Sequence, residues 1–142
     1  MKTGAINFVG LTDYDDYCTF TVTVATEGLS ESMSFFGYSD EFQRFGEALV
    51  QFPFGSEQEI AYQYLEDIGQ GPGFLLLKAY CIDPMGHTAL QVILDNCERM
   101  PLRRRLEFSI LAEPASINEL GKKIVGWDLK VNESLEWEAQ TS

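Results

Sequence analysis

Residues 17–25 read YCTFTVTVA, in which Cys18, Phe20, Val22 and Val24 alternate with three threonines. This period of two is typical of a β-strand that has one face on a core and the other face in water. Glu27-Gly28 then supplies a turn, and residues 30–36 (SESMSFF) return as the partner strand of a hairpin. A shorter apolar segment at residues 5–9 predicts an earlier strand.

An amphipathic helix is predicted directly after the hairpin. It begins at residues 39–41 (SDE), where the Ser39 hydroxyl could cap free N–H groups and two carboxylates suit the positive end of the helix dipole. Pro53 ends it. Its apolar residues form one stripe, which we expect to pack against the sheet rather than to anchor a partner: Phe42, Phe45, Leu49 and Phe52.

The second half of the chain predicts an antiparallel meander followed by a second helix. Strands are expected at residues 59–68, 74–82, 87–95 and 105–111, joined by a glycine-rich loop at 69–73, a turn at 83–86 and a polar connection at 96–104. The helix begins at Pro114, carries Ile117, Leu120 and Ile124 on one stripe, and ends at Gly126, for which a left-handed conformation is predicted.

Together these elements predict one α+β domain at residues 5–126, followed by an acidic C-terminal tail at 127–142. A last strand at Leu129–Val131 is the alternative for part of that tail. The expected architecture is a single antiparallel β-sheet of about six or seven strands, a hairpin and then a meander, packed against two helices.

The charge of the chain limits its partners. Its 142 residues include 22 acidic and 10 basic ones, a formal net charge of −12. Nucleic acid and anionic membrane surfaces are not expected to bind it, since both need a basic face. A basic protein would be attracted, although the acidity could also serve solubility alone. Without a signal peptide or a long apolar run, a cytoplasmic location is expected.

No pattern of residues predicts catalysis, a metal site or a cofactor. His87 is the only histidine, and it follows a turn with no nucleophile motif beside it. Residues 13–16 (DYDD) lack the glycine and the distal glutamate of a calcium loop. The cysteines are odd in number and widely spaced, which predicts neither a disulfide framework nor a zinc site: Cys18, Cys81 and Cys97.

Three segments in order carry a family resemblance. They are the hairpin leading into Ser39–Leu49, the strand around Gly86–Val92, and the strand Leu106–Leu111 leading to Ile117–Leu120. In this order they resemble the small acidic immunity proteins of the WapI family, which are encoded beside contact-dependent bacterial toxins. The resemblance covers residues 5–125. It implies a cytoplasmic protein that binds and neutralises a cognate toxin, often a nuclease, and it implies no catalytic residues.

The expected function is therefore that of a non-enzymatic acidic domain, an immunity protein that neutralises a basic toxin. A small-molecule-binding or general interaction domain is the alternative, and a homodimer stays open. Residues 1–60 contain ten acidic residues against Lys2 and Arg44, a net charge of −8, so we expect the partner to contact this part of the chain. The candidate contact residues are Asp13, Asp15, Asp16, Glu27 and Glu31.

Overall fold

The computed structural model describes residues 2–65 and 73–141 and confirms the α+β class. The strands in these residues are β1 (Lys2–Tyr14), β2 (Tyr17–Thr26), β3 (Leu29–Tyr38), β4 (Glu59–Leu65), β5 (Phe74–Cys81), β6 (Thr88–Asp95), β7 (Arg105–Leu111) and β8 (Ser134–Gln140). The helices are α1 (Gln43–Leu49) and α2 (Pro114–Val125). The last residues of the strand predicted at 59–68, and the glycine-rich loop apart from Gly73, lie outside the described residues.

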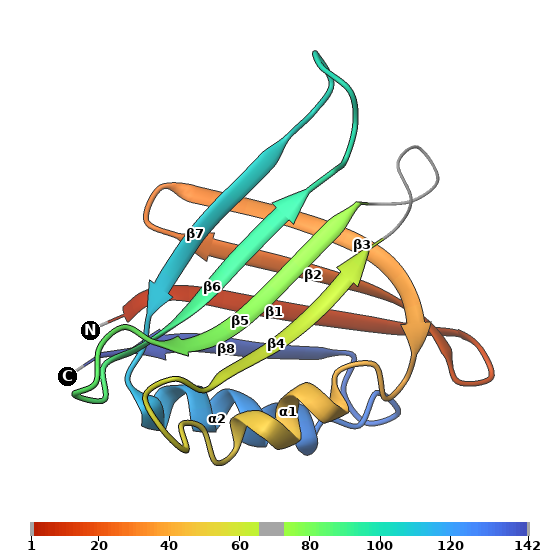
Figure 1. Ribbon diagram of the computed structural model, residues 1–142. Coiled ribbons are helices and arrows are strands. Elements are labelled where there is room, and N and C mark those ends of the chain that lie inside the picture. Colours follow the sequence, from red (N-terminus) through yellow and green to blue (C-terminus); the bar gives the residue numbers. More distant parts are fainter. Residues whose placement is uncertain (1, 66–72, 142) are drawn as a thin grey trace.

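The prediction of a single sheet was wrong, because the strands form two antiparallel sheets of four strands each. Sheet A has the order β3-β2-β1-β8, and sheet B has the order β4-β5-β6-β7 (Figure 1). The hairpin and the meander each bury one apolar face, and the two faces cover one another. The period of two shows which side chains share a face, but it does not show whether two such faces belong to one sheet.

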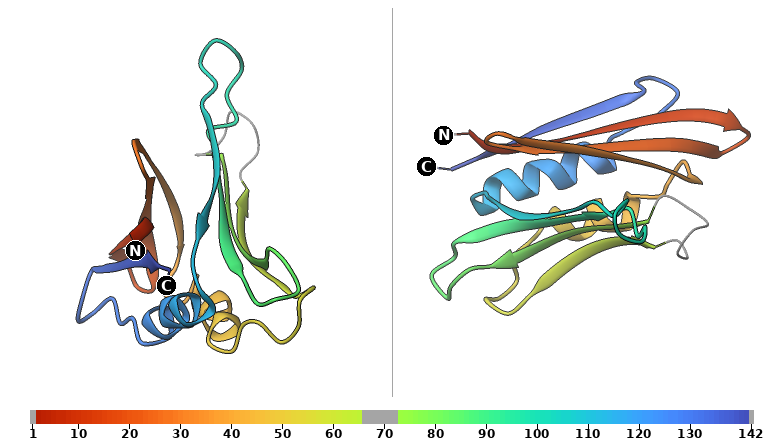
Figure 2. Two further views of the ribbon diagram at one scale, coloured as in Figure 1. Left: turned by 90° about the vertical axis from the view of Figure 1, so that its left-hand side faces the viewer. Right: turned by 90° about the horizontal axis from the view of Figure 1, so that it is seen from above.

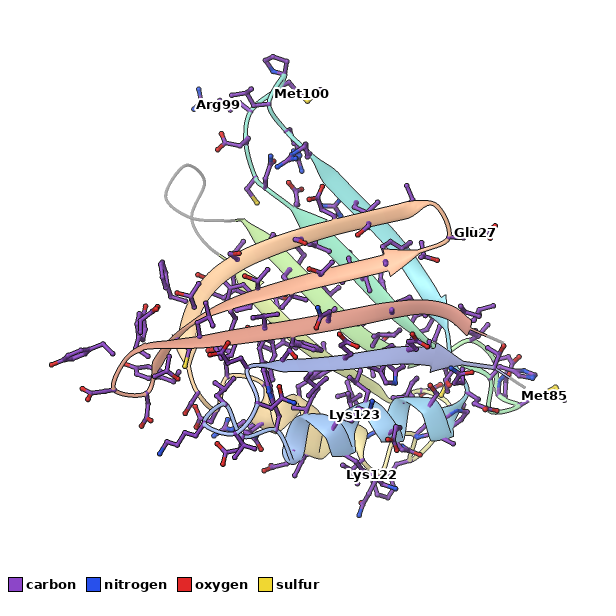
Figure 3. All side chains as sticks on the ribbon, turned by 180° about the vertical axis from the view of Figure 1, so that it is seen from behind. Glu27, Met85, Arg99, Met100, Lys122 and Lys123 are labelled. Carbon is purple, nitrogen blue, oxygen red and sulfur yellow. The ribbon has the colours of Figure 1, made fainter. Side chains whose placement is uncertain are left out.

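The two sheets face each other and diverge away from the helices, which close one end of the molecule (Figure 2). Between the sheets lies the core, in which sheet A contributes Phe8, Phe20 and Phe35 and sheet B contributes Leu75 and Leu77, all at most 2% exposed. At the open end, the connection between β6 and β7 rises beyond both sheets, with Arg99 and Met100 at its tip (Figure 3).

The predicted apolar stripes of both helices are confirmed. Every stripe residue is at most 4% exposed: Phe42, Phe45, Leu49, Phe52, Ile117, Leu120 and Ile124. The helices cross closely at Gly46 and Gly121, where a Cβ atom on Gly121 would lie 2.7 Å from the Gly46 carbonyl oxygen. Neither described helix is long and apolar enough to cross a membrane.

The predicted start of the first helix and the predicted conformation of Gly126 were wrong. Ser39 does not cap α1, which begins only at Gln43 after a stretch of turns and has no side-chain cap. The Ser39 N–H instead donates to the Asp16 carbonyl oxygen at 2.8 Å, so this residue still belongs to the hairpin. Gly126 does end α2, but its φ of −85° is not left-handed, and its N–H closes a normal helical turn on the Lys122 carbonyl oxygen.

Residues 127–142, predicted as an acidic tail, contain strand β8. It pairs antiparallel with β1, with Trp137 opposite Ile6. Trp137 is 2% exposed, and its indole Nε1 donates to the Ser116 carbonyl oxygen at 2.9 Å. The alternative strand at Leu129–Val131 is wrong, since those residues do not form a strand. In SLEWEAQ, apolar residues alternate with glutamates, a period of two that the acidic composition obscures.

Candidate functional site

The structure places the five predicted contact residues in three locations. Asp13, Asp15 and Asp16 lie at the connection between β1 and β2, at one end of sheet A. Glu27 lies on the β2–β3 turn at the opposite end of the same sheet (Figure 3). Glu31 lies on β3 and lines a cleft between the sheets. Only the three aspartates therefore share one surface.

Local backbone geometry exposes these aspartates. The register between β1 and β2 shifts between Thr12 and Tyr14, which leaves Asp13 without a partner in the ladder. Asp15 has a φ of 53°, a left-handed conformation that aspartate tolerates better than most residues. The Thr19 hydroxyl donates to the Asp13 carboxylate, while the Asp15 and Asp16 side chains project into solvent.

An acidic groove of about 680 Å³ lies beside this connection, between the end of sheet A, the turns before α1 and the segment after α2. Its carboxylates come from separate parts of the sequence: Asp15, Asp16, Asp40, Asp128 and Glu133. Of the residues that the structure describes, Lys130 is the one cation that lines the groove. We call the six acidic residues Asp13, Asp15, Asp16, Asp40, Asp128 and Glu133 the acidic end. Carboxylates gathered around one groove produce a negative potential that attracts a cation or a basic surface.

An exposed aromatic cluster, not predicted from the sequence, lies next to the acidic end. Tyr14, Tyr17, Phe36 and Tyr38 are 78, 42, 56 and 62% exposed, and we call them the aromatic patch. The rings of Tyr17 and Phe36 stack at 5.9 Å, and Tyr38 meets Tyr17 edge-on at 5.5 Å. Strand parity contains the signal, since Tyr17 lies on the same side of β2 as Thr19, Thr21 and Thr23, opposite the buried face.

Beyond the aromatic patch, the part of this outer face that β2 and β3 form is polar. Thr21 and Ser34 lie opposite each other with hydroxyl oxygens 2.8 Å apart, and those of Thr23 and Ser32 are 2.7 Å apart. Each pair of hydroxyls shares a hydrogen bond, and these side chains offer little apolar surface to a partner. The aromatic patch is therefore a local feature of one end of the face, where exposed aromatic side chains with polar atoms suit a protein interface.

His87 lies on the exposed turn before β6, with its Nδ1 2.7 Å from Asp83 Oδ2 and its side chain 70% exposed. The hydrogen bond from His87 holds the pKa of Asp83 below its usual value. Among the described residues, no three His, Cys, Asp or Glu side chains are placed to hold a metal ion.

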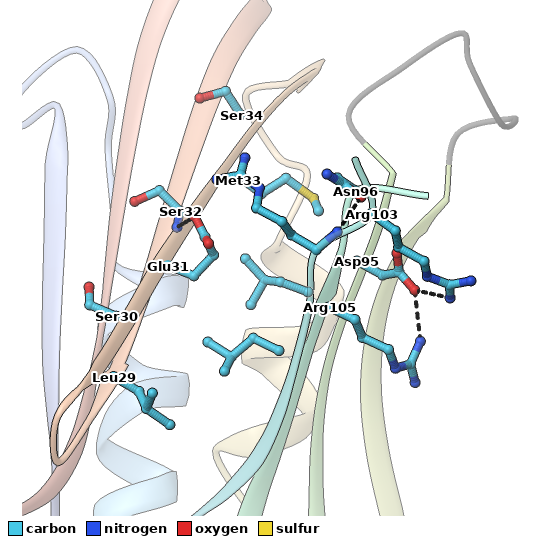
Figure 4. Close-up of a pocket in the computed structure, with 13 residues that line it drawn as sticks. Leu29, Ser30, Glu31, Ser32, Met33, Ser34, Asp95, Asn96, Arg103 and Arg105 are labelled. Carbon is cyan, nitrogen blue, oxygen red and sulfur yellow. Dashed lines mark hydrogen bonds and ion pairs between the residues drawn. The ribbon is translucent and has the colours of Figure 1, made fainter. Parts of the chain in front are cut away.

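Asp95, at the end of β6, stabilises the part of the β6–β7 connection that lies nearest the sheet (Figure 4). Its side chain is 3% exposed and accepts hydrogen bonds from Arg103 at 2.6 Å, Arg105 at 3.0 Å and the Cys97 N–H at 2.8 Å. Burial acts to raise the pKa of Asp95, but these donors outweigh it, so the pKa lies below its usual value. Two of the three sequential arginines thus have a structural role.

Replacing Asp95 by asparagine (D95N) is expected to lower the free energy of unfolding by about 2 kcal/mol at pH 7, because hydrogen bonds to a charged group are lost. Since the folded-state pKa is depressed, the stabilisation is complete above about pH 4 and is lost as the pH falls through the lower folded-state value. Urea unfolding between about pH 2 and pH 7 should therefore show a shallower acid slope for D95N. An unchanged slope would contradict this role, and the neighbouring exposed variant E98Q serves as the control.

The chain was compared with known proteins in three ways. No protein-family model matches it, and neither a curated protein nor a solved structure matches it. The resemblance to the WapI family therefore stays an expectation from the sequence.

Proposed function

We propose that this chain is a non-enzymatic protein-binding domain that recognises a basic protein through the aromatic patch and the acidic end. The observation that carries the proposal is the position of exposed aromatic rings beside six carboxylates. In the part of the chain that the structure describes, Lys130 is the one cation that lines the groove. Aromatic residues supply much of the binding energy at protein interfaces, and carboxylates around them select a cationic partner.

The two surfaces have complementary roles. Tyr17, Phe36 and Tyr38 form a rigid cluster whose ring faces accept the guanidinium or ammonium groups of a partner as well as its apolar side chains. The carboxylates of the acidic end lie around one end of this cluster and remain solvated before binding. They raise the rate of encounter with a basic surface, while the rings slow dissociation.

Neutralisation of a basic toxin, which the sequence resemblance implies, is one form of this function, and we propose it as the biological role. An immunity protein needs no active site, only a surface that occludes the toxin or holds it inactive. The product of the gene adjacent to this one is therefore the first protein to test as a partner.

Replacing Asp13, Asp15 and Asp16 together by asparagine is expected to slow association with that protein about tenfold at low salt, with a smaller effect on dissociation. The reason is the loss of long-range attraction, which salt screens in the unmodified chain. Association rates measured by surface plasmon resonance at two ionic strengths test this expectation.

A matched control changes the net charge equally at sites away from the acidic end, replacing the exposed Glu57, Glu98 and Glu119 by glutamine. It should slow association much less than the aspartate triple variant. Equal slowing by both variants would show that only the overall charge matters, and salt-independent association would contradict electrostatic recognition altogether.

A further inference from the structure

The two edges of sheet A differ in how their backbone groups are covered. On β8, the Lys123 ammonium group donates to the Glu136 carbonyl oxygen at 2.9 Å, and the Gln140 N–H donates to the Ser116 hydroxyl at 3.0 Å. Helix α2 thus protects that edge. The other edge, β3, pairs with β2 over ten consecutive residues without a register shift. It contains no proline or lysine, the usual protections of an edge strand.

Two hydrogen bonds show which groups of β3 point away from β2. The Ser32 N–H donates to its neighbouring Glu31 carboxylate at 3.1 Å, and the Tyr38 carbonyl oxygen accepts from the Glu41 N–H at 3.0 Å. The N–H and C=O groups of successive residues in a strand point alternately to its two sides. The backbone groups of Ser34 and Phe36 therefore also point away from β2, toward the free edge. The Glu31 carboxylate occupies a position where the carbonyl oxygen of an added strand would accept the Ser32 N–H.

A cleft of about 630 Å³ runs along this free edge (Figure 4). Residues 29–34 of β3 line one side, and the adjoining ends of β6 and β7 line the other. The apolar side chains that line it are Leu29, Met33, Leu94 and Leu106. The apolar lining along the strand edge suits alternate side chains of an extended chain.

The charge at the cleft differs from that of the chain as a whole. Arg103 and Arg105 are held by Asp95, whereas in the described part of the chain the Arg104 guanidinium has no ion pair. All three arginines line the cleft, against the carboxylates of Glu31 and Asp95. A carboxylate on the bound segment would pair with Arg104 in a charge-assisted hydrogen bond.

We propose that β3 is a strand-addition site, which takes an extended segment of a partner protein as a fifth strand of sheet A. The bound segment alternates apolar side chains, which enter the cleft, with polar ones on the outer face, and it places one acidic side chain toward Arg104. Such strands bind through main-chain hydrogen bonds and derive specificity from alternate side chains. A second copy of the chain is a poorer occupant, since each copy has a net charge of −12 and the two would repel.

The test titrates the ¹⁵N-labelled full chain with the synthetic peptide acetyl-Thr-Val-Thr-Glu-Thr-Val-Thr-amide and follows the amide resonances. We expect saturable shifts at Ser30, Ser34 and Phe36. The same peptide with lysine in place of glutamate should bind about fivefold more weakly, because it loses the pair with Arg104. Arg104→Gln should produce the same loss, whereas Arg99→Gln, at the tip of the connection, should not.

The sharpest pair of variants is at Ser34. Ser34→Pro removes an N–H that faces the free edge and leaves the pairing with β2 in place, so binding should weaken at least about tenfold. Ser34→Ala keeps that N–H and should bind as the unmodified chain does. Equal binding by the two variants, or no shifts at about 5 mM peptide, would overturn the proposal. Concentration-dependent shifts at β3 without peptide would also overturn it, because they would identify a second copy as the occupant.

Discussion

Replacing Phe36 and Tyr38 by threonine is expected to weaken binding to the cognate basic protein by about 100-fold or more. The expectation follows from interface energetics, in which a few central aromatic residues each contribute about 2 kcal/mol or more. Threonine retains a strong β-propensity and matches the polar remainder of the face, so the free energy of unfolding should change by less than about 1 kcal/mol. Isothermal titration calorimetry with the protein from the adjacent gene measures the affinity.

The control for this variant replaces two other exposed apolar residues, Ile82 and Leu111, by threonine. They are 48 and 52% exposed, comparable with Phe36, but they lie outside the aromatic patch and the cleft along β3. This variant should bind within about threefold of the unmodified chain. If both double variants lose affinity equally, or if the aromatic variant loses none, then the aromatic patch is not the centre of the interface.

Replacing Trp137 by alanine is expected to lower the free energy of unfolding by about 3–5 kcal/mol, the usual cost of truncating a buried tryptophan. The side chain is 2% exposed, and its loss leaves a cavity and removes the hydrogen bond from the indole N–H to the Ser116 carbonyl oxygen. Urea denaturation followed by circular dichroism measures the change.

Glu136→Ala, next to Trp137 on the exposed face of β8, should change stability by less than about 0.5 kcal/mol. A loss below about 1 kcal/mol for Trp137→Ala would show that β8 contributes little to the cooperative fold. Residues 127–142 would then be closer to the tail that the sequence predicts than to the strand that the structure describes.

Local patterns in the sequence were sufficient for most of the elements. The threonine alternation around Phe20 predicted β2 and its hairpin, and the stripe containing Phe45 predicted the buried face of α1. These patterns depend on interactions within a few residues, which the chain order records directly. The position of Pro114 likewise marked the start of α2.

Those patterns did not predict how elements distant in the sequence pair and pack. Sheet A is completed by β8 pairing with β1, a contact between residues more than 100 positions apart in sequence. Helix α1 begins late because Ser39 completes the hairpin instead of capping the helix. Tertiary context decides both outcomes, and local propensity gives no information on either.

Local patterns also did not show which residues share a candidate binding surface. Composition indicated an acidic N-terminal part, but it grouped Glu27 and Glu31 with Asp13, although the fold separates them. Asp128 and Glu133 join the acidic end from the opposite end of the chain. The aromatic patch was available in principle, since Phe36 and Tyr38 share the strand parity of Ser30, Ser32 and Ser34.

Hydrogen exchange of the chain alone and in complex with the protein from the adjacent gene tests the proposed interface most directly. We expect the largest gain in protection at residues 12–19 and 36–40, which contain the aromatic patch and much of the acidic end. The β5–β6 turn around Met85 should exchange equally in both states. Protection confined to that turn or to the helices, or no complex at all, would contradict binding of a basic protein at this end of sheet A.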